Sequence, residues 1–238
     1  MPMAISPTRV FGVLLVATLS TQVACERPTH GQPPAPEKDL ARTSETELRY
    51  AVLAGGCFWC TEGVFQMLDG VVSVESGYAG GTAETANYRM VASGQTAHAE
   101  AIRIRYDARR LSYGQLLQVF FATHDPTTLN RQGPDVGPQY RSAIFFANDQ
   151  EKQVAAAYIA QLNEAKAFGK PVVTTLEPLV EFFVAEGYHQ DFVEKNPDHP
   201  YIRQQAIPKM QKTEKFFPEL LRGAAGNEAG AASTQPGR

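Results

Sequence analysis

The sequence predicts an α+β fold: one domain in which helices cover a mixed β-sheet to form a two-layer sandwich. Three patterns point to this class. Residues 48–54 are largely apolar and run through a Gly-Gly turn into a helical pattern, residues 100–106 alternate apolar and charged side chains, and residues 113–121 repeat apolar side chains at helical spacing. Strand and helix patterns that follow one another without an internal repeat favour one sheet with helices packed on it.

The first half of the domain is predicted to contain three strands and one helix. In order, these are a strand at 48–54, a helix at 57–68, and strands at 71–78 and 100–106. The last of these strands carries Ile102 and Ile104 on one face and Arg103 and Arg105 on the other. Because side chains alternate between the two faces of a strand, we expect this strand to be half-buried.

A capping pattern marks the clearest helix of the chain. Ser112 is followed three residues later by Gln115, a pair that satisfies free backbone N–H groups at a helix start. Apolar residues then fall at i, i+3, i+4, i+7 and i+8, namely Tyr113, Leu116, Leu117, Phe120 and Phe121. Beyond this helix we predict a strand at 142–147, a helix at 149–167 and a strand at 171–176.

Composition limits the classes of protein that the chain can belong to. A length of 238 residues with 43% hydrophobic residues is ample for a packed core, so disorder is excluded as the dominant state. The net charge of −3 gives no basic excess, and nucleic acid is therefore not an expected partner. Outside the N-terminus no apolar run approaches the roughly 20 residues of a membrane span.

The two ends of the chain differ from the domain between them. Residues 1–25 combine Arg9, an apolar run at 10–19 and a small-residue exit, which is typical of a secretory signal peptide. Residues 26–46 are rich in proline and predict a linker, residues 47–222 form the domain, and the small, polar residues 223–238 predict a disordered tail. We therefore expect an exported protein, located in the periplasm or attached to the cell envelope.

Cys25 bears on how the chain is held after export. A cysteine directly after Ala24 is a candidate for lipidation and for membrane attachment as a lipoprotein, although Gln22 stands where such signals usually carry an aliphatic residue. Removal with the leader is the alternative. Either fate leaves Cys57 and Cys60 as the cysteines of the domain.

The motif GGCFWC, residues 55–60, is the sharpest chemical feature. A strand and a Gly-Gly turn place Cys57 at a helix N-terminus, where free backbone N–H groups stabilise a thiolate. Cys60 lies one turn further on the same face, within reach of a disulfide. The pattern predicts that Cys57 is a nucleophile and Cys60 its resolving partner.

Other interpretations of this motif remain open at this point. The two cysteines could pack as small hydrophobic residues of the core. A zinc site would need two more ligands at metal spacing, and a c-type haem would need His where Thr61 stands. A CxxC that enters a helix in an exported protein would also suit a thioredoxin-like disulfide oxidoreductase.

Further motifs make the sequence resemble the peptide methionine sulfoxide reductase A family, whose members reduce the S epimer of methionine sulfoxide. The resemblance runs from about Tyr50 to Phe217. It is carried, in order, by GCFW (56–59), GYAGG (77–81), NYR (87–89), HAEAIRIRYD (98–107), HDPT (124–127), RQGPDVGPQYRSAIF (131–145) and YHQDFVEKNP (188–197). Many members place resolving cysteines in a C-terminal tail. This tail has none, so the resemblance assigns resolution to Cys60, as in members with a CFWC motif.

The resemblance implies a role for each residue of the site. Cys57 is the nucleophile, Glu100 the acid, Phe58 and Trp59 line a methyl pocket, and Tyr88, Asp135 and Tyr140 surround the substrate. A thiolate can attack sulfoxide sulfur only if charge on the oxygen is neutralised, which suits a carboxylic acid and two phenols. To donate at neutral pH, Glu100 must be buried so that its pKa rises. His98, His124 and His189 are expected to make structural hydrogen bonds only.

The resemblance also implies the remaining participants. Departure of methionine leaves a sulfenic acid on Cys57, which Cys60 condenses into a disulfide. An external dithiol such as thioredoxin or dithiothreitol reduces that disulfide, so no metal, flavin or nucleotide cofactor is expected. The expected function is repair of free or protein-bound methionine sulfoxide by a monomer.

Overall fold

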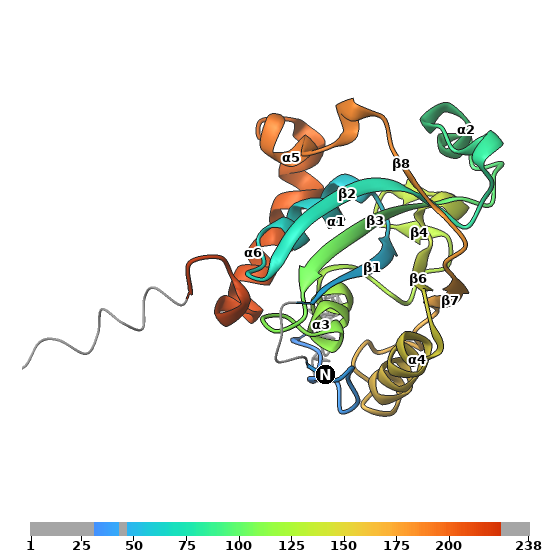
Figure 1. The fold of residues 1–238 in the computed structure, drawn as a ribbon. Helices are drawn as coiled ribbons and strands as arrows, with labels where there is room; N and C mark the ends of the chain where they lie inside the picture. Colours follow the sequence, from blue (N-terminus) through green and yellow to red (C-terminus); the bar gives the residue numbers. More distant parts are fainter. Residues whose placement is uncertain (1–30, 43–46, 225–238) are drawn as a thin grey trace, which may run out of the picture.

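The structure is a computed structural model that describes residues 31–42 and 47–224. The predicted signal peptide and Cys25 lie outside the described residues, as does nearly all of the predicted tail. Figure 1 shows one sheet with helices packed against it, which confirms the predicted α+β class. None of the helices in the described parts of the chain is long and apolar enough to cross a membrane.

Six strands form the main sheet, in the order β7-β6-β1-β3-β2-β8. All neighbours are antiparallel except β6 and β7, so the sheet is mixed, as predicted. A separate two-stranded hairpin pairs β4 with β5. The strands are β1 (Leu48–Gly55), β2 (Val71–Ala79), β3 (Ala99–Asp107), β4 (Arg131–Gln132), β5 (Asp135–Val136), β6 (Ser142–Phe146), β7 (Thr175–Pro178) and β8 (Phe182–Val184).

Helices cover the sheet and enclose the main core. They are α1 (Phe58–Gln66), α2 (Tyr88–Ala92), α3 (Tyr113–Thr123), α4 (Asp149–Glu164), α5 (Phe192–Lys195) and α6 (Ile207–Phe216), with short turns η1 (Ala83–Thr85), η2 (Pro138–Tyr140), η3 (Gly187–His189), η4 (Ile202–Ala206) and η5 (Pro218–Leu220). The predicted capping box of α3 is present, because Ser112 and Gln115 each accept a hydrogen bond from the other's backbone N–H. A second, smaller cluster is made mostly of alanines, which lets chain segments pack closely on the sheet there.

The strand predicted at 171–176 is displaced toward the C-terminus. The Val172 N–H donates to the Asn163 side chain and the Val173 N–H donates to the carbonyl of Pro126. These two donors are therefore engaged outside the sheet, and parallel pairing with β6 begins only at Thr175. The strand prediction was wrong for residues 171–174.

Part of the predicted linker lies against the domain. Between residues 31 and 42, the carbonyl of Pro33 accepts a hydrogen bond from Gln118, the carbonyl of Pro34 accepts one from Tyr158, and Asp39 accepts one from the Gly114 N–H. Residues 31–42, which we call the N-terminal strap, thereby contact α3 and α4 (Figure 1).

Three chain segments meet at one end of the sheet. Gly55 at the end of β1 pairs with Ser142 at the beginning of β6, and on the other side β1 neighbours β3, which begins at Ala99. The residues directly after β1, at the start of β3 and directly before β6 are therefore brought together. These are the segments that carry Cys57, Glu100 and Tyr140.

Candidate active site

The turn between β1 and α1 holds Cys57 at the helix start. Gly56 has a φ of 93°, and a Cβ there would lie only 2.5 Å from Cγ of Gln132, so the turn requires glycine. Cys57 is the N-cap residue of α1, and its side chain makes no capping hydrogen bond. The thiol is therefore free to face the space beyond the helix end.

Glu100 takes the capping position that Cys57 leaves vacant. Its Oε2 atom accepts a hydrogen bond of 3.1 Å from the backbone N–H of Phe58, and its side chain is almost fully buried, with 2% of the residue exposed. Burial raises the pKa of Glu100 to about 8, with a smaller contribution from Asp135, while the Phe58 hydrogen bond opposes the shift. The carboxyl group therefore holds its proton at neutral pH.

A cavity of about 170 Å³ lies between these groups. It is smaller than the roughly 300–1,000 Å³ of pockets for drug-sized ligands and suits the end of one side chain. Seven of the eight residues predicted for the site line it, together with one that was not predicted. The lining residues are Cys57, Phe58, Trp59, Tyr88, Glu100, Asp135, Tyr140 and Tyr201.

Cys60, the eighth predicted residue, is buried but does not line the cavity. Both cysteines are buried free thiols, and each shifts the pKa of the other. Burial raises the pKa of Cys57 well above its ordinary value, and the neighbouring Cys60 and Glu100 raise it further. The thiolate predicted at this helix start is thus not the resting state, because the sequence shows the helix end but not the depth of burial.

Aromatic side chains form the wall beside Cys57. The Trp59 ring stacks on Phe192 with 3.7 Å between centroids and 6° between planes, and its Nε1–H donates to Nδ1 of His189 over 3.1 Å. The ring of Phe58 is buried and lies 4.9 Å from that of His189. His189 thus makes the structural hydrogen bond expected of it, and the wall is rigid and largely apolar.

Two tyrosines contribute hydroxyl groups from different elements. Tyr88 begins α2, where its backbone N–H donates to Glu186 over 2.9 Å, and Tyr140 ends η2. Burial raises the pKa of both phenols, and the nearby Glu100 adds to the effect. Both side chains are therefore protonated hydrogen-bond donors at neutral pH.

Tyr201 is the residue of the cavity that sequence reasoning missed. Its hydroxyl donates to Asp135, its ring meets Trp59 edge-on at 6.1 Å, and its side chain lowers the pKa of the Cys57 and Cys60 thiols. It follows Pro200, four residues after the last motif of the resemblance. Only long-range packing of this loop on Trp59 brings the residue to the site.

Within the described ranges, no three His, Cys, Asp or Glu side chains gather as ligands for a metal ion. The site offers instead two thiols, one protonated carboxyl group and several phenols around a small cavity. This set can support attack by sulfur on a polarised group and proton donation to it.

The comparison with known proteins agrees with this geometry. The family model described as peptide methionine sulfoxide reductase matches residues 49–220, a segment that contains every residue lining the cavity. Peptide methionine sulfoxide reductase MsrA of Deinococcus radiodurans is 51% identical over 172 residues, which cover 72% of this chain and 84% of the relative. MsrA 2 of Mesorhizobium japonicum is 51% identical over 185 residues, which cover 77% and 93%.

Solved structures show the same likeness. Mxr1 from Saccharomyces cerevisiae in reduced form matches with a TM-score of 0.58 and 32% identity over 67% of this chain and 91% of that one. Methionine sulfoxide reductase A of Corynebacterium diphtheriae matches with a TM-score of 0.55 and 28% identity over 71% and 87%. With the family model covering the whole cavity, the chain belongs to the peptide methionine sulfoxide reductase family and is an oxidoreductase of its MsrA branch.

Proposed function

We propose that this protein reduces the S epimer of methionine sulfoxide, free or in proteins, to methionine with electrons from thiols. One observation carries the proposal: a buried cysteine and a carboxyl group held protonated by burial border one cavity of about 170 Å³. A sulfoxide needs both a sulfur nucleophile and a proton donor for its oxygen, and this cavity supplies both.

In the first step, Sγ of Cys57 bonds to the sulfoxide sulfur while the oxygen gains a proton from Glu100. The proton lost by the Cys57 thiol replaces the one that Glu100 donates. Tyr88 and Tyr140 donate hydrogen bonds to the oxygen as charge develops there. The oxygen then passes to Sγ of Cys57 and methionine leaves, so that the substrate gains two electrons and Cys57 becomes a sulfenic acid.

The walls of the cavity orient the substrate for this step. Phe58 and the Trp59 ring, held by Phe192 and His189, form an apolar surface for the thioether methyl group. Asp135, fixed by the hydroxyl of Tyr201, lies among the residues surrounding the substrate. With the methyl group on one side and the proton donors on the other, a fixed pocket accepts one configuration at sulfur.

In the second step, Cys60 attacks Sγ of Cys57. An S–S bond forms, the S–O bond breaks and water leaves. The two buried thiols each shift the pKa of the other, and this proximity supports the role proposed for Cys60. An external dithiol, thioredoxin-like in the cell or dithiothreitol in the assay, then supplies two electrons and two protons to restore both thiols.

The protein is further proposed to act outside the cytoplasm, in the periplasm or on the cell envelope. The pattern of residues 1–25 supports export, and Cys25 is the proposed lipid attachment. An exported enzyme of this kind requires electrons carried across the membrane, and a membrane-linked thioredoxin-like donor fits that need. Mass spectrometry of the mature N-terminus distinguishes a lipidated Cys25 from a leader removed together with it.

The activity is tested with separated S and R epimers of a methionine sulfoxide. Residues 26–238 are incubated with dithiothreitol, and the thioether product is followed by chromatography. Product from the S epimer alone is the expected result. No product from either epimer, with insulin disulfides still reduced, would instead identify a general disulfide oxidoreductase.

A further inference from the structure

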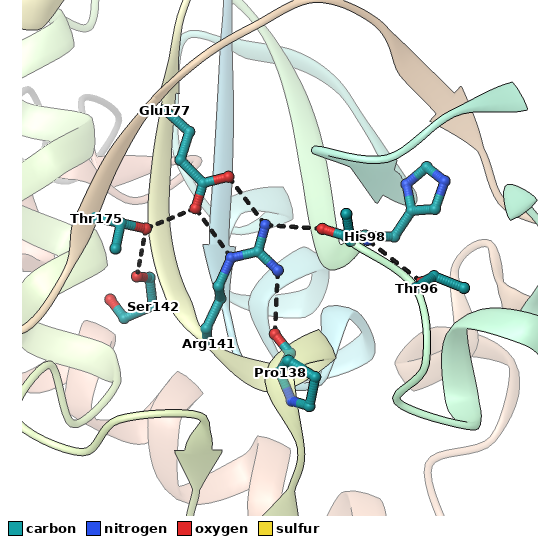
Figure 2. Close-up of polar contacts among 8 residues, drawn as sticks. Thr96, His98, Pro138, Arg141, Ser142, Thr175 and Glu177 are labelled. Atoms are coloured by element: carbon teal, nitrogen blue, oxygen red, sulfur yellow. Dashed lines mark hydrogen bonds and ion pairs between the residues drawn. The ribbon is translucent and has the colours of Figure 1, made fainter.

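The side chain of Arg141 occupies a position that the proposed mechanism does not use. Arg141 directly follows Tyr140, and its guanidinium group forms a two-point ion pair with Glu177 on β7 (Figure 2). The Nε–Oε1 and Nη2–Oε2 distances are both 2.9 Å. With 14% of the Arg141 side chain and 27% of the Glu177 side chain exposed, the pair is largely shielded from water.

The remaining donors of the guanidinium group bind two backbone carbonyls. Nη1 donates to the carbonyl of Pro138 and Nη2 to that of Ala97, each over 3.1 Å (Figure 2). Pro138 begins η2, whose last residue is Tyr140, and Ala97 lies three residues before Glu100. One planar group therefore joins the loop that carries the phenol to the segment that carries the acid.

The Glu177 carboxylate that pairs with Arg141 is itself held in place. Thr175 donates to Oε1 of Glu177 over 2.7 Å. Although burial tends to raise the pKa of Glu177, hydrogen bonds from Arg141 and Thr175 lower it below its ordinary value, so the carboxylate stays charged. The end of β2 also makes room for the pair: a Cβ on Gly80 would lie 2.8 Å from Nη2 of Arg141.

We propose that Arg141 and Glu177 are positioning residues that set the separation of Glu100 and Tyr140 across the cavity. This inference rests on the proposed function, since it concerns how two proton donors reach one sulfoxide oxygen. Arg141 reaches neither substrate nor thiol and acts only through the carbonyls of Pro138 and Ala97. The reaction rate depends strongly on the positions of the reacting groups, and a displacement of roughly 1 Å lowers the rate on the order of 100-fold.

The test uses Arg141→Lys and Glu177→Gln. A lysine keeps the charge, but its single ammonium group cannot hold Glu177 at two points and both carbonyls at once. The matched controls are Arg103→Lys and Glu75→Gln, because Arg103 and Glu75 form an ion pair between β3 and β2, in which Nε and Nη2 both donate to Oε2 of Glu75 over 2.8 and 2.6 Å. That pair binds no carbonyl of the site.

The reduced protein is mixed with excess S epimer without reductant, and the methionine formed in one turnover is timed at several substrate concentrations. We expect Arg141→Lys to lower the limiting rate about 10- to 100-fold, and Glu177→Gln to lower it less. Three other properties of these variants should stay close to those of the unaltered protein. They are the half-saturating substrate concentration, the rate of Cys57 alkylation by iodoacetamide and the midpoint of thermal unfolding. The controls should keep the limiting rate.

A second variant separates positioning from a general loss of structure. In Arg141→Ala, added guanidinium ion should restore part of the limiting rate, and methylammonium should not, because only the planar ion bridges Glu177 and the carbonyls. Limiting rates of Arg141→Lys and Glu177→Gln equal to those of the controls would overturn the inference. So would a loss that guanidinium cannot restore and that parallels slower alkylation. An unaltered protein that does not reduce the S epimer would refute the proposed function itself.

Discussion

Replacing Glu100 with glutamine tests the acid role with little change in shape. Glutamine matches the protonated carboxyl group in size and charge, and its side-chain oxygen can still accept the hydrogen bond from the Phe58 N–H. The fold and the Cys57 thiol should therefore persist. What is lost is a proton that can move to the sulfoxide oxygen.

The size of the effect follows from the pKa of Glu100. At pH 7, a pKa of about 8 leaves about 90% of the carboxyl groups protonated, whereas the ordinary value of 4.5 would leave about 0.3%. Burial thus increases the protonated fraction of Glu100 at pH 7 about 300-fold. Since general acid catalysis contributes about 100- to 10,000-fold, we expect Glu100→Gln to slow methionine formation at least about 100-fold.

The acid role of Glu100 also predicts the direction in which the rate changes with pH. Because Glu100 acts in its protonated form, the single-turnover rate should fall as the pH rises past about 8, where that proton is lost. Glu100→Gln should show no such decline. The matched control is Glu62→Gln, which alters a buried carboxyl group on α1 whose pKa is also raised, to about 7, but which does not line the cavity. This control should keep the decline near pH 8.

The assay is the single-turnover reaction with the S epimer, measured from neutral to alkaline pH alongside iodoacetamide alkylation of Cys57. A Glu100→Gln protein that alkylates normally and reduces the epimer at the unaltered rate would refute the acid role. A decline near pH 8 that persists in Glu100→Gln would assign that titration to a group other than Glu100.

Four further substitutions test the site and the fold. Cys57→Ser should abolish methionine formation, and an appreciable residual rate would remove its nucleophilic role. Cys60→Ser should still form one methionine per chain but lose thioredoxin-coupled recycling; unchanged recycling would point to another resolving route. Tyr201→Phe removes the hydroxyl group that lowers the pKa of both thiols, so alkylation at pH 7 should slow about 3- to 10-fold, and equal rates would contradict this. Ser112→Ala removes the α3 cap and should lower the free energy of unfolding in urea by about 1 kcal/mol, while an unchanged midpoint would mean that the cap is dispensable.

Local patterns predicted the elements whose causes are local. The capping pair Ser112 and Gln115 fixes where α3 begins, and the alternation around Ile102 and Ile104 reflects a strand with one face in the core. The turn before Cys57 likewise has a local cause, because Gly56 adopts a positive φ that favours glycine and the glycine is visible in the sequence. These features needed no knowledge of distant neighbours.

The parts that were missed depend on contacts between distant segments. Tyr201 reaches the cavity because its loop packs on Trp59, and no periodicity marks it. The displaced start of β7 follows from the partners of Val172 and Val173, which lie on other elements. The raised pKa of Cys57 results from burial of its side chain. Loss of water around the sulfur raises the pKa by more than the helix N-terminus lowers it.

The N-terminal strap bears on how the domain would be held in the tethered form proposed above. Asp39 binds the first turn of α3 at Gly114, whereas the far end of that helix packs beside Gly55, two residues before Cys57. An 11-residue helix is about 16 Å long, and the strap binds it at Gly114, Gln115 and Gln118, so the strap extends from the first turn to the middle of α3 while the cavity lies near its last turn. The proposed tether through residues before the strap would therefore reach the domain along α3 and not at the helix end beside the cavity.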